Sequence, residues 1–151
     1  MSEPNDAYGR PRTLTEGPFA GWTTWSEGAD PFETHNGPFV FRVEPDGRAV
    51  AAFQPERKHL NGAGAIHGGA LMSFADFSLF AIAHAQLKDD VNSVTLTMNS
   101  EFIGAGDLDG WVTARGDVLR ETRSIVFIRG LLVQRDRPLL AFSGTLKKLG
   151  R

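Results

Sequence analysis

One acidic side chain stands alone in a long apolar segment. Between Gly69 and Ala83 the only residue that can carry a charge is Asp76. An unpaired polar group in a dry environment costs roughly 2 to 7 kcal/mol, and an ionised group costs more. An aspartate at this position could cap a neighbouring backbone group or reach the surface. We prefer the interpretation that it is a carboxylate held in a cleft to act on water or on substrate.

A glycine-rich loop, HLNGAGAIHGG at positions 59–69, comes directly before this segment. The following residues contain no proline and no further glycine, which predicts a helix within 68–87 that is buried on most sides. Its first backbone N–H groups, at Gly68, Gly69 and Ala70, are expected to be free and to suit a developing oxyanion or a polarised carbonyl. Asn61 adds an amide that can position water or a carbonyl, although alone it would be an ordinary loop residue.

The spacing of the loop and helix residues resembles the signature of a known family. That family is the hotdog-fold acyl-CoA thioesterases of the phenylacetic-acid (PaaI-like) group, within the 4-hydroxybenzoyl-CoA thioesterase superfamily. The matching pattern is His59-x-Asn61-x-x-Gly64-x-x-His67-Gly68-Gly69, with Asp76 further along the helix. The resemblance extends over about 39–149, most of the chain.

Membership in this family would imply a fold and a set of roles. The expected fold is a long central helix wrapped by an antiparallel sheet. The expected roles are an oxyanion-hole N–H on Gly68 and a general base or nucleophile at Asp76. Asn61 and Thr95 match the family residues that help to hold the attacking water.

Other candidates depend on position in the loops and the helix. His67 is better explained as a structural residue that anchors the turn before the helix than as a catalytic base, and we keep both roles open. The substrate-binding candidates are His59, Gly69, Phe77 and Arg123. The cations that could meet the phosphates of CoA are Arg57, Lys58, Arg120 and Arg123. No metal or cofactor is expected, because the histidines lack a full ligand set.

Composition excludes several classes of protein. The chain has 151 residues, 41% of them hydrophobic, which suits one domain with its own core. Its net charge of -2 provides no basic surface for nucleic acid, and it contains no cysteine. No apolar segment at the N-terminus indicates secretion, and the apolar segment 68–87 carries Asp76 in its middle. We therefore expect a cytoplasmic protein without a membrane span.

The order of predicted elements is typical of an α+β domain. Strands at 39–43 and 49–53 flank the turn Pro45-Asp46-Gly47 and should pair as a hairpin. After the helix come strands at 94–103, 111–119, 124–134 and 139–147. In the first of these, alternation predicts Val94, Leu96, Met98 and Phe102 on one face. Residues 1–17 are expected to be a flexible tail, and 18–151 a single hotdog thioesterase domain with an aromatic N-terminal arm at 18–37. The arm is expected to pack against an edge of the body, or to close an acyl pocket.

Helix geometry predicts the oligomeric state. Gly68 and Asp76 lie eight residues apart, which separates them by roughly 12 Å along the helix and about 80° around it. One thioester cannot touch both, so the site would need two chains. The minimal active unit is therefore predicted to be a homodimer. The resemblance to the family suggests that two such dimers pair into a tetramer.

Three functions remain open from the sequence. The first is hydrolysis of an aryl- or medium-chain acyl-CoA. The second is a hotdog hydratase or dehydratase that uses His67 with Asp76, although the loop lacks the D-x-N-P-x-H pattern of such enzymes. The third is a non-catalytic acyl-CoA-binding module, which would have no need of the acid. Release of free CoA would distinguish the first from the other two.

Overall fold

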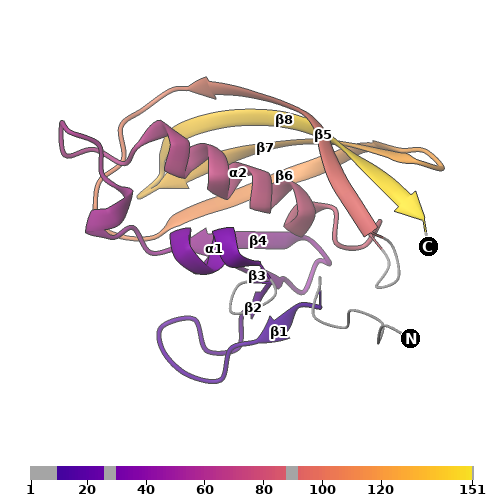
Figure 1. Ribbon diagram of the computed structural model, residues 1–151, viewed down its shortest axis with the longest axis horizontal. Coiled ribbons are helices and arrows are strands. Elements are labelled where there is room, and N and C mark those ends of the chain that lie inside the picture. Colours follow the sequence, from indigo (N-terminus) through magenta and orange to yellow (C-terminus); the bar gives the residue numbers. More distant parts are fainter. Residues whose placement is uncertain (1–9, 26–29, 88–91, 151) are drawn as a thin grey trace.

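One long helix lies across a curved antiparallel sheet. The computed structural model describes residues 10–25, 30–87 and 92–150. The helix is α2 (Gly68–Ile82), and in the described residues the sheet has eight strands. In Figure 1 the sheet bends around α2, with β8 and β5 on one side of the helix and β4 and β3 on the other. This arrangement confirms the predicted α+β hotdog fold.

The strands do not lie in the sheet in their order along the chain. The spatial order is β1-β2-β3-β4-β6-β7-β8-β5, so the strand that follows α2 crosses to the far edge. β5 is therefore an edge strand paired on one side only, with β8. The strand bounds are β1 Arg12–Thr13, β2 Thr23–Thr24, β3 Val40–Val43, β4 Ala49–Phe53, β5 Asn92–Phe102, β6 Val112–Glu121, β7 Ile125–Gln134 and β8 Arg137–Gly150.

The predicted hairpin before the motif loop is present as β3 and β4. Val40 pairs with Ala52, and the turn between the strands holds Gly47 at φ +82°, a conformation that favours glycine. The Asp46 carboxylate accepts a hydrogen bond from the Arg48 N–H at 2.9 Å, as turn aspartates commonly do.

Helix α2 is shorter than the predicted segment 68–87. It ends at Ile82, because the backbone of Ala83 turns to φ -87° and ψ 11°. The following residues form tighter i to i-3 hydrogen bonds, from the His84 N–H to Ala81 and from the Gln86 N–H to Ala83. The apolar faces of α2 are buried against the sheet, together with Phe39 and Phe53. One stripe of the helix, which carries Met72, Ser73 and Asp76, remains partly open.

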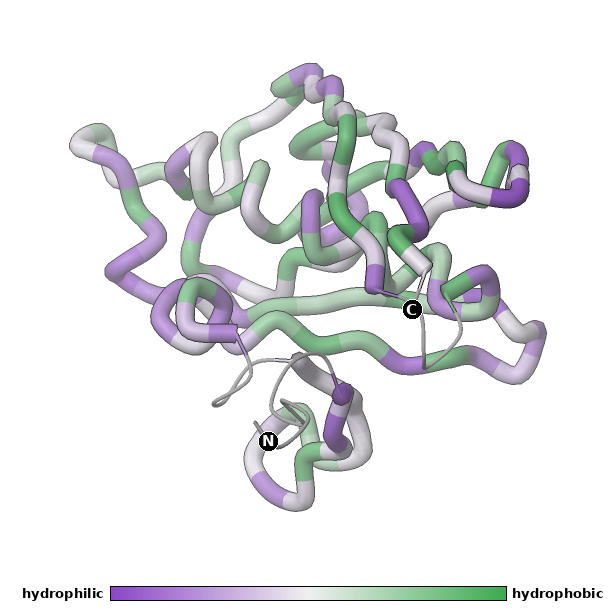
Figure 2. The backbone as a smooth tube through the Cα atoms, turned by 45° about the vertical axis from the view of Figure 1, so that its right-hand side comes forward, coloured by the Kyte–Doolittle hydropathy of each residue, from purple (hydrophilic) through white to green (hydrophobic). Residues whose placement is uncertain are grey.

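The N-terminal arm covers the other face of the sheet. β2 belongs to this arm and β1 directly precedes it, and the described residues around these two strands form the lowest part of the tube in Figure 2. The helix α1 (Pro31–Asn36) ends the arm next to the motif loop, where the Asn36 carbonyl contacts the His59 ring. The apolar residues of the arm make a second cluster with the outward side chains of β3 and β4, consisting of Phe19, Trp22, Val40, Val50 and Ala52. Trp25 instead stacks on Phe41 and meets the edge of Phe77 on the helix side. β1 lies within the segment 1–17 that we expected to be a tail, of which 1–9 is outside the described residues.

The predicted alternation along β5 is wrong in its first half. A register shift between Thr95 and Thr97 introduces a bulge, which changes which side chains face the helix. Thr95 therefore reaches α2, whereas Val94 and Leu96 are 41% and 51% exposed. After the bulge Met98 packs against the core, as predicted.

Candidate active site

The motif loop is a compact turn closed by its own backbone. The His67 N–H donates to the His59 carbonyl at 2.7 Å, and the Asn61 N–H donates to the Ala65 carbonyl at 2.8 Å. The Asn61 side-chain oxygen accepts from the N–H groups of Ala63 and Ala65, at 2.9 and 3.1 Å. Asn61 therefore shapes the loop with its oxygen, and its exposed amide nitrogen remains to donate to a ligand.

The start of α2 presents one available donor instead of the three that we expected. His67 is the N-cap, and its Nδ1 accepts from the Gly69 N–H at 2.8 Å. The Ala70 N–H donates to the His67 carbonyl at 2.9 Å. The Gly68 N–H meets no acceptor within the described parts of the chain. The N–H group left unpaired is that of Gly68, the glycine predicted to be the oxyanion donor.

Capping also determines the state of the His67 ring. Because Nδ1 accepts a hydrogen bond, the neutral ring carries its proton on Nε2. His67 is exposed, and its ring caps the start of α2 next to the Gly68 N–H.

Asp76 and Thr95 meet as the resemblance implies. The Thr95 hydroxyl donates to Asp76 Oδ1 at 2.6 Å, which joins α2 to the edge strand β5. Asp76 is half-buried, and its second oxygen accepts no hydrogen bond from the residues that the structure describes. That oxygen is available to a water or to a substrate carbon.

The two halves of the expected site lie apart along α2, one at its start at Gly68 and one about two turns later at Asp76. Thr95 of β5 contacts Asp76. At the start of α2 the Phe102 ring covers Gly68, since a Cβ on Gly68 would lie 2.9 Å from Phe102 Cε1. The helix and the strand thus run antiparallel, and one chain cannot bring the Gly68 N–H to its own Asp76. From the sequence Phe102 is only a strand residue, because its contact with Gly68 depends on the packing of distant segments.

An apolar strip accompanies these two half-sites. It consists of Val94 and Leu96 on the face of β5 turned away from α2, and of Phe102 on β5 and Met72 on α2 on the helix side, which are 41%, 51%, 56% and 41% exposed. The backbone of β5 has pairing groups available on the same side, because β5 is a sheet edge. Exposed apolar residues beside a free strand edge are typical of a surface that another chain covers.

Two substrate-binding candidates are enclosed in this protomer. His59 is 4% exposed, and its ring bonds to the Glu56 N–H and to the Asn36 carbonyl, so it supports the motif loop from behind. Phe77 is 2% exposed and packs among the aromatic core side chains. Neither side chain is open to a ligand here. Gly69 lies at the helix start with its N–H occupied by His67.

One of the four cationic candidates for CoA binding, Lys58, has its partners within the chain. Lys58 donates to the carbonyls of His35 and Gly37, both at 2.9 Å, so it fastens the end of α1. Arg123 is exposed in the turn between β6 and β7, and Arg57 and Arg120 are also exposed. These three arginines remain candidates for phosphate contacts.

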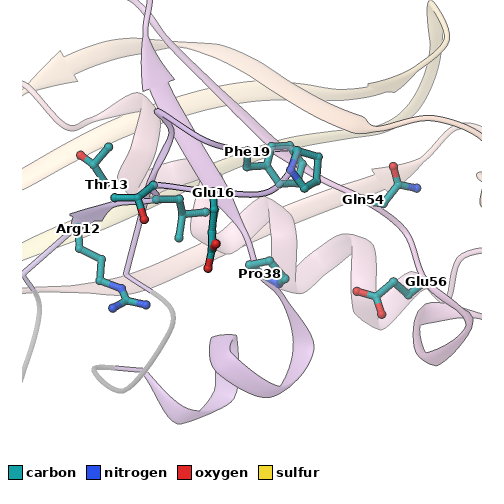
Figure 3. A pocket seen from close by; sticks show the side chains of 10 residues that line it. Arg12, Thr13, Glu16, Phe19, Pro38, Gln54 and Glu56 are labelled. Carbon is teal, nitrogen blue, oxygen red and sulfur yellow. The ribbon is translucent and has the colours of Figure 1, made fainter.

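A hollow of about 630 Å³ lies elsewhere, between the arm and the link from β4 to the motif loop. In Figure 3 Arg12 and Thr13 stand at one end and Gln54 and Glu56 at the other. None of the catalytic candidates lines it, so we do not assign the chemistry to it. Among the described residues no cluster of acids and histidines could hold a metal ion. In the same part of the chain no helix is long and apolar enough to cross a bilayer.

Comparison with known proteins agrees with this geometry. The family model described as the thioesterase superfamily matches residues 63–141, which include the helix start, Asp76 and Thr95. The chain belongs to the thioesterase superfamily. It is a hotdog thioester hydrolase of the PaaI-like type.

Solved structures of several other proteins share its fold. A conserved protein of Pseudomonas aeruginosa is 26% identical with a TM-score of 0.71, and the match covers 80% of this chain and 94% of that one. A mutant of the phenylacetic acid degradation protein PaaI from Thermus thermophilus is 25% identical with a TM-score of 0.67, covering 80% and 100%. A hypothetical thioesterase from Streptococcus pneumoniae, solved with coenzyme A, is 21% identical with a TM-score of 0.65, covering 75% and 87%. No curated protein sequence matches the chain.

Proposed function

We propose that this superfamily member hydrolyses acyl-CoA thioesters at a site shared between two copies of the chain. The observation that carries the proposal is the separation of the unpaired Gly68 N–H, beside Phe102, from the Asp76–Thr95 pair about two helical turns further along α2. In each site Gly68 of one chain would donate to the thioester carbonyl, and Asp76 of the partner subunit would act on the same carbon.

The free edge of β5 suggests how the second chain is placed. Thr95 and Phe102 mark the two ends of the strand that face the helix. If two copies of β5 pair antiparallel so that Thr95 lies opposite the partner's Phe102, a two-fold axis passes between Met98 and Asn99. Each Gly68 then approaches the partner's Asp76, and the apolar strip becomes buried. The homodimer is therefore the unit that completes the site, and a dimer of dimers stays a prediction.

The chemistry follows from the groups that are available. The Gly68 N–H stabilises the oxyanion as the carbonyl carbon becomes tetrahedral. The partner's Asp76, oriented by Thr95, removes a proton from a water that attacks this carbon, and Asn61 can donate to that water from its amide. The C–S bond then breaks, the thiolate of CoA leaves and takes up a proton, and the free acid remains. Asp76 could instead attack directly and form an anhydride that water hydrolyses, which a mass adduct on Asp76 after rapid quenching would reveal.

Two comparisons support the choice of substrate class. A structural relative was solved with coenzyme A, and another relative is named as a phenylacetic acid degradation protein. We propose an aryl- or medium-chain acyl-CoA as the substrate. A panel of such thioesters, assayed with a thiol-detecting dye, tests this directly. The chain contains no cysteine, so the protein itself contributes no dye signal. Binding of acyl-CoA without release of thiol would refute the hydrolase and favour a binding module.

The shared site has a separate test. Gly68→Val and Asp76→Ala chains, each nearly inactive, are unfolded together and refolded as a mixture. Half of the randomly formed dimers are mixed, and each mixed dimer holds one intact site of two, so activity should recover to about one quarter of wild type. If demonstrably mixed dimers recover no activity, or a monomer is fully active, each chain builds its own site and the proposal of a shared site is wrong.

A further inference from the structure

One amide side chain is fully buried far from the residues already assigned. Gln134 ends β7 and is 0% exposed. Its Oε1 accepts from the Asp107 N–H at 3.0 Å, and its Nε2 donates to the carbonyls of Asp107 and Gly110 at 2.8 and 2.9 Å. All three bonds go to the segment 103–111 that links β5 to β6, which we call the support loop. Burial of an amide is tolerated because its polar atoms are paired, so these bonds hold the support loop in one conformation.

The outer side of the support loop is fastened by an ion pair. The Arg135 guanidinium donates to both carboxylate oxygens of Asp107, at 2.9 and 2.7 Å. Asp107 also accepts from the Asp109 N–H at 2.9 Å, which closes a turn inside the loop. Arg135 and Asp136 have positive φ angles of 49° and 62°, so the turn between β7 and β8 aims Arg135 at the loop from a two-residue hairpin.

The support loop is joined directly to the motif loop. The Ile66 N–H donates to the Gly106 carbonyl at 3.0 Å. Ile66 is 4% exposed and directly precedes the N-cap residue His67 and the donor Gly68. The two loops are also in close contact, because a Cβ on Gly106 would lie 2.7 Å from Ile66 Cδ1 and 2.9 Å from Leu139 Cδ1.

We propose that Gln134 is a positioning residue for hydrolysis. Through the support loop and the Ile66 N–H it holds the start of α2, and with it the Gly68 N–H, in the orientation that meets the thioester carbonyl. The proposal rests on the proposed function, and it adds a residue that contacts no substrate. Its physical basis is that an oxyanion donor works only when it is held in place before the reaction, and a displacement of about 1 Å can cost about 10²-fold in rate.

The main test replaces Gln134 with Met, which keeps the length of the side chain and removes its three hydrogen bonds. We expect kcat for an acyl-CoA substrate to fall on the order of 10- to 100-fold, while KM changes by less than about threefold because the surface that binds CoA is untouched. The matched control is Thr24→Val. Thr24 is also 0% exposed, and its hydroxyl donates to the Phe39 carbonyl at 2.7 Å in the arm, far from the motif loop. The control should lower the melting temperature and leave kcat within about twofold of wild type.

A second variant keeps the proposal testable if Gln134→Met does not fold. Gly106→Ala places a methyl group 2.7 Å from Ile66 Cδ1, 2.9 Å from Leu139 Cδ1 and 3.3 Å from Gln134 Oε1, so the support loop or these side chains must shift. It should lower kcat in the same direction by a smaller factor, roughly two- to tenfold. Hydrogen exchange of the Ile66 amide provides a readout independent of turnover, and it should accelerate in both variants and not in Thr24→Val.

The outcomes separate this proposal from the proposed function. Unchanged kcat and unchanged Ile66 exchange in either folded variant would overturn the positioning role even though wild type remains a thioesterase. A loss of activity in Thr24→Val equal to that in Gln134→Met would overturn it too, because the loss would then reflect general destabilisation. If wild type hydrolyses no acyl-CoA, the proposed function fails, and the exchange of Ile66 still decides whether Gln134 holds the motif loop.

Discussion

The two ends of the sheet differ in what covers their apolar side chains. At the β3–β4 end, α2 covers one face and the N-terminal arm covers the other, so Val40, Val50 and Ala52 are 0%, 3% and 0% exposed. At the β5 end, α2 covers one face and nothing within the described chain covers the edge. Leu96 and Phe102 remain 51% and 56% exposed there. The closed end is completed by the chain itself, whereas the open end carries both half-sites, which we propose are completed by a second copy.

The two regions of the sheet should therefore contribute differently, the closed end to the stability of the chain and the open end to its activity. Side chains at the closed end contribute buried apolar area, which stabilises the single chain. Side chains at the open end contribute little to the stability of one chain, because they are exposed. In the proposed dimer they would become important, because there the Gly68 N–H would approach the partner's Asp76. The following predictions test this division, from the largest expected effect on activity to the smallest.

A charge on the open edge should abolish activity by preventing dimerisation. Leu96→Arg places a guanidinium in the apolar strip, where pairing with a second copy would desolvate it. We expect a folded monomer with turnover reduced by more than about 10²-fold, as removal of an essential group commonly does. Light scattering after gel filtration measures the mass, and thiol release measures the activity.

Val43→Arg is the control for this charge. Val43 is 48% exposed at the end of β3, on the closed side of the sheet. That variant should remain dimeric and active. An active monomer of Leu96→Arg would mean that the open edge is not where the site is completed.

Removal of the carboxylate should stop chemistry without unfolding the protein. Asp76→Asn keeps the shape and an acceptor for the Thr95 hydroxyl but cannot take a proton or attack carbon. We expect a loss of about 10² to 10⁴ in kcat and a melting temperature close to that of wild type, because a half-buried acid contributes little to stability. Retained turnover together with a much lower melting temperature would instead identify Asp76 as a structural residue.

A side chain on Gly68 should displace the oxyanion donor in a way that depends on Phe102. Its Cβ would lie 2.9 Å from the Phe102 ring, and the ring end is able to move. Gly68→Val should reduce kcat by about 10² to 10³. The smaller Gly68→Ala should lose less, and adding Phe102→Ala to it should restore part of the loss by making room. If kcat of the double variant is lower than that of Gly68→Ala, the Phe102 ring is needed at the site for another reason.

Truncation at the closed end should reduce stability and spare the chemistry. Trp22 is 6% exposed, packs against Phe19 and Trp111, and lies under the Arg42 guanidinium. Trp22→Ala should lower the free energy of unfolding by about 3 kcal/mol, as large aromatic deletions do. At a temperature where the variant is folded, kcat should equal that of wild type. A large fall in kcat at full folding would show that the arm takes part in the site.

The smallest expected effect is on the stability of the fold at acidic pH. Hydrogen bonds from Arg135 are the main cause that lowers the pKa of Asp107 from 3.8 to about 2. A carboxyl whose pKa is depressed in the folded state stabilises the fold above its unfolded pKa, and this contribution is lost as the pH falls towards the folded value. Between about pH 4 and about pH 2 the stability of wild type should therefore fall more steeply than that of Asp107→Asn. Urea unfolding across this window measures the difference, and parallel curves would contradict the prediction.

The site could be predicted largely because its parts are local in the chain. The glycine-rich loop, the helix that follows it and a lone acid in that helix are each visible as residue types at short spacing. The distance from Gly68 to Asp76 also follows from helical rise alone, so the prediction of a site shared by two chains requires no coordinates. The contact of Thr95 with Asp76 was reached through the resemblance to a family, since no local rule brings a strand residue to a given helix position.

Other features depend on long-range packing and were missed. The bulge at Leu96 reverses the side chains of β5 by one residue, which no alternation pattern reveals. The capture of the Gly69 N–H by His67, which leaves Gly68 as the single donor, depends on a side-chain rotamer. The proposed role of Gln134 could not be predicted because its two partner residues, Asp107 and Gly110, lie 27 and 24 residues away, in the segment between two predicted strands.

The sequence by itself determined the elements, the motif and the distance between its two reactive parts, because these depend on backbone geometry over a few residues. Only the tertiary structure decided which backbone N–H remains unpaired, which face of β5 meets the helix and which loop supports the motif. The physical reason is that a hydrogen-bond partner or a buried neighbour is chosen among all segments that the fold brings together. Residues close in the chain limit that choice but do not make it.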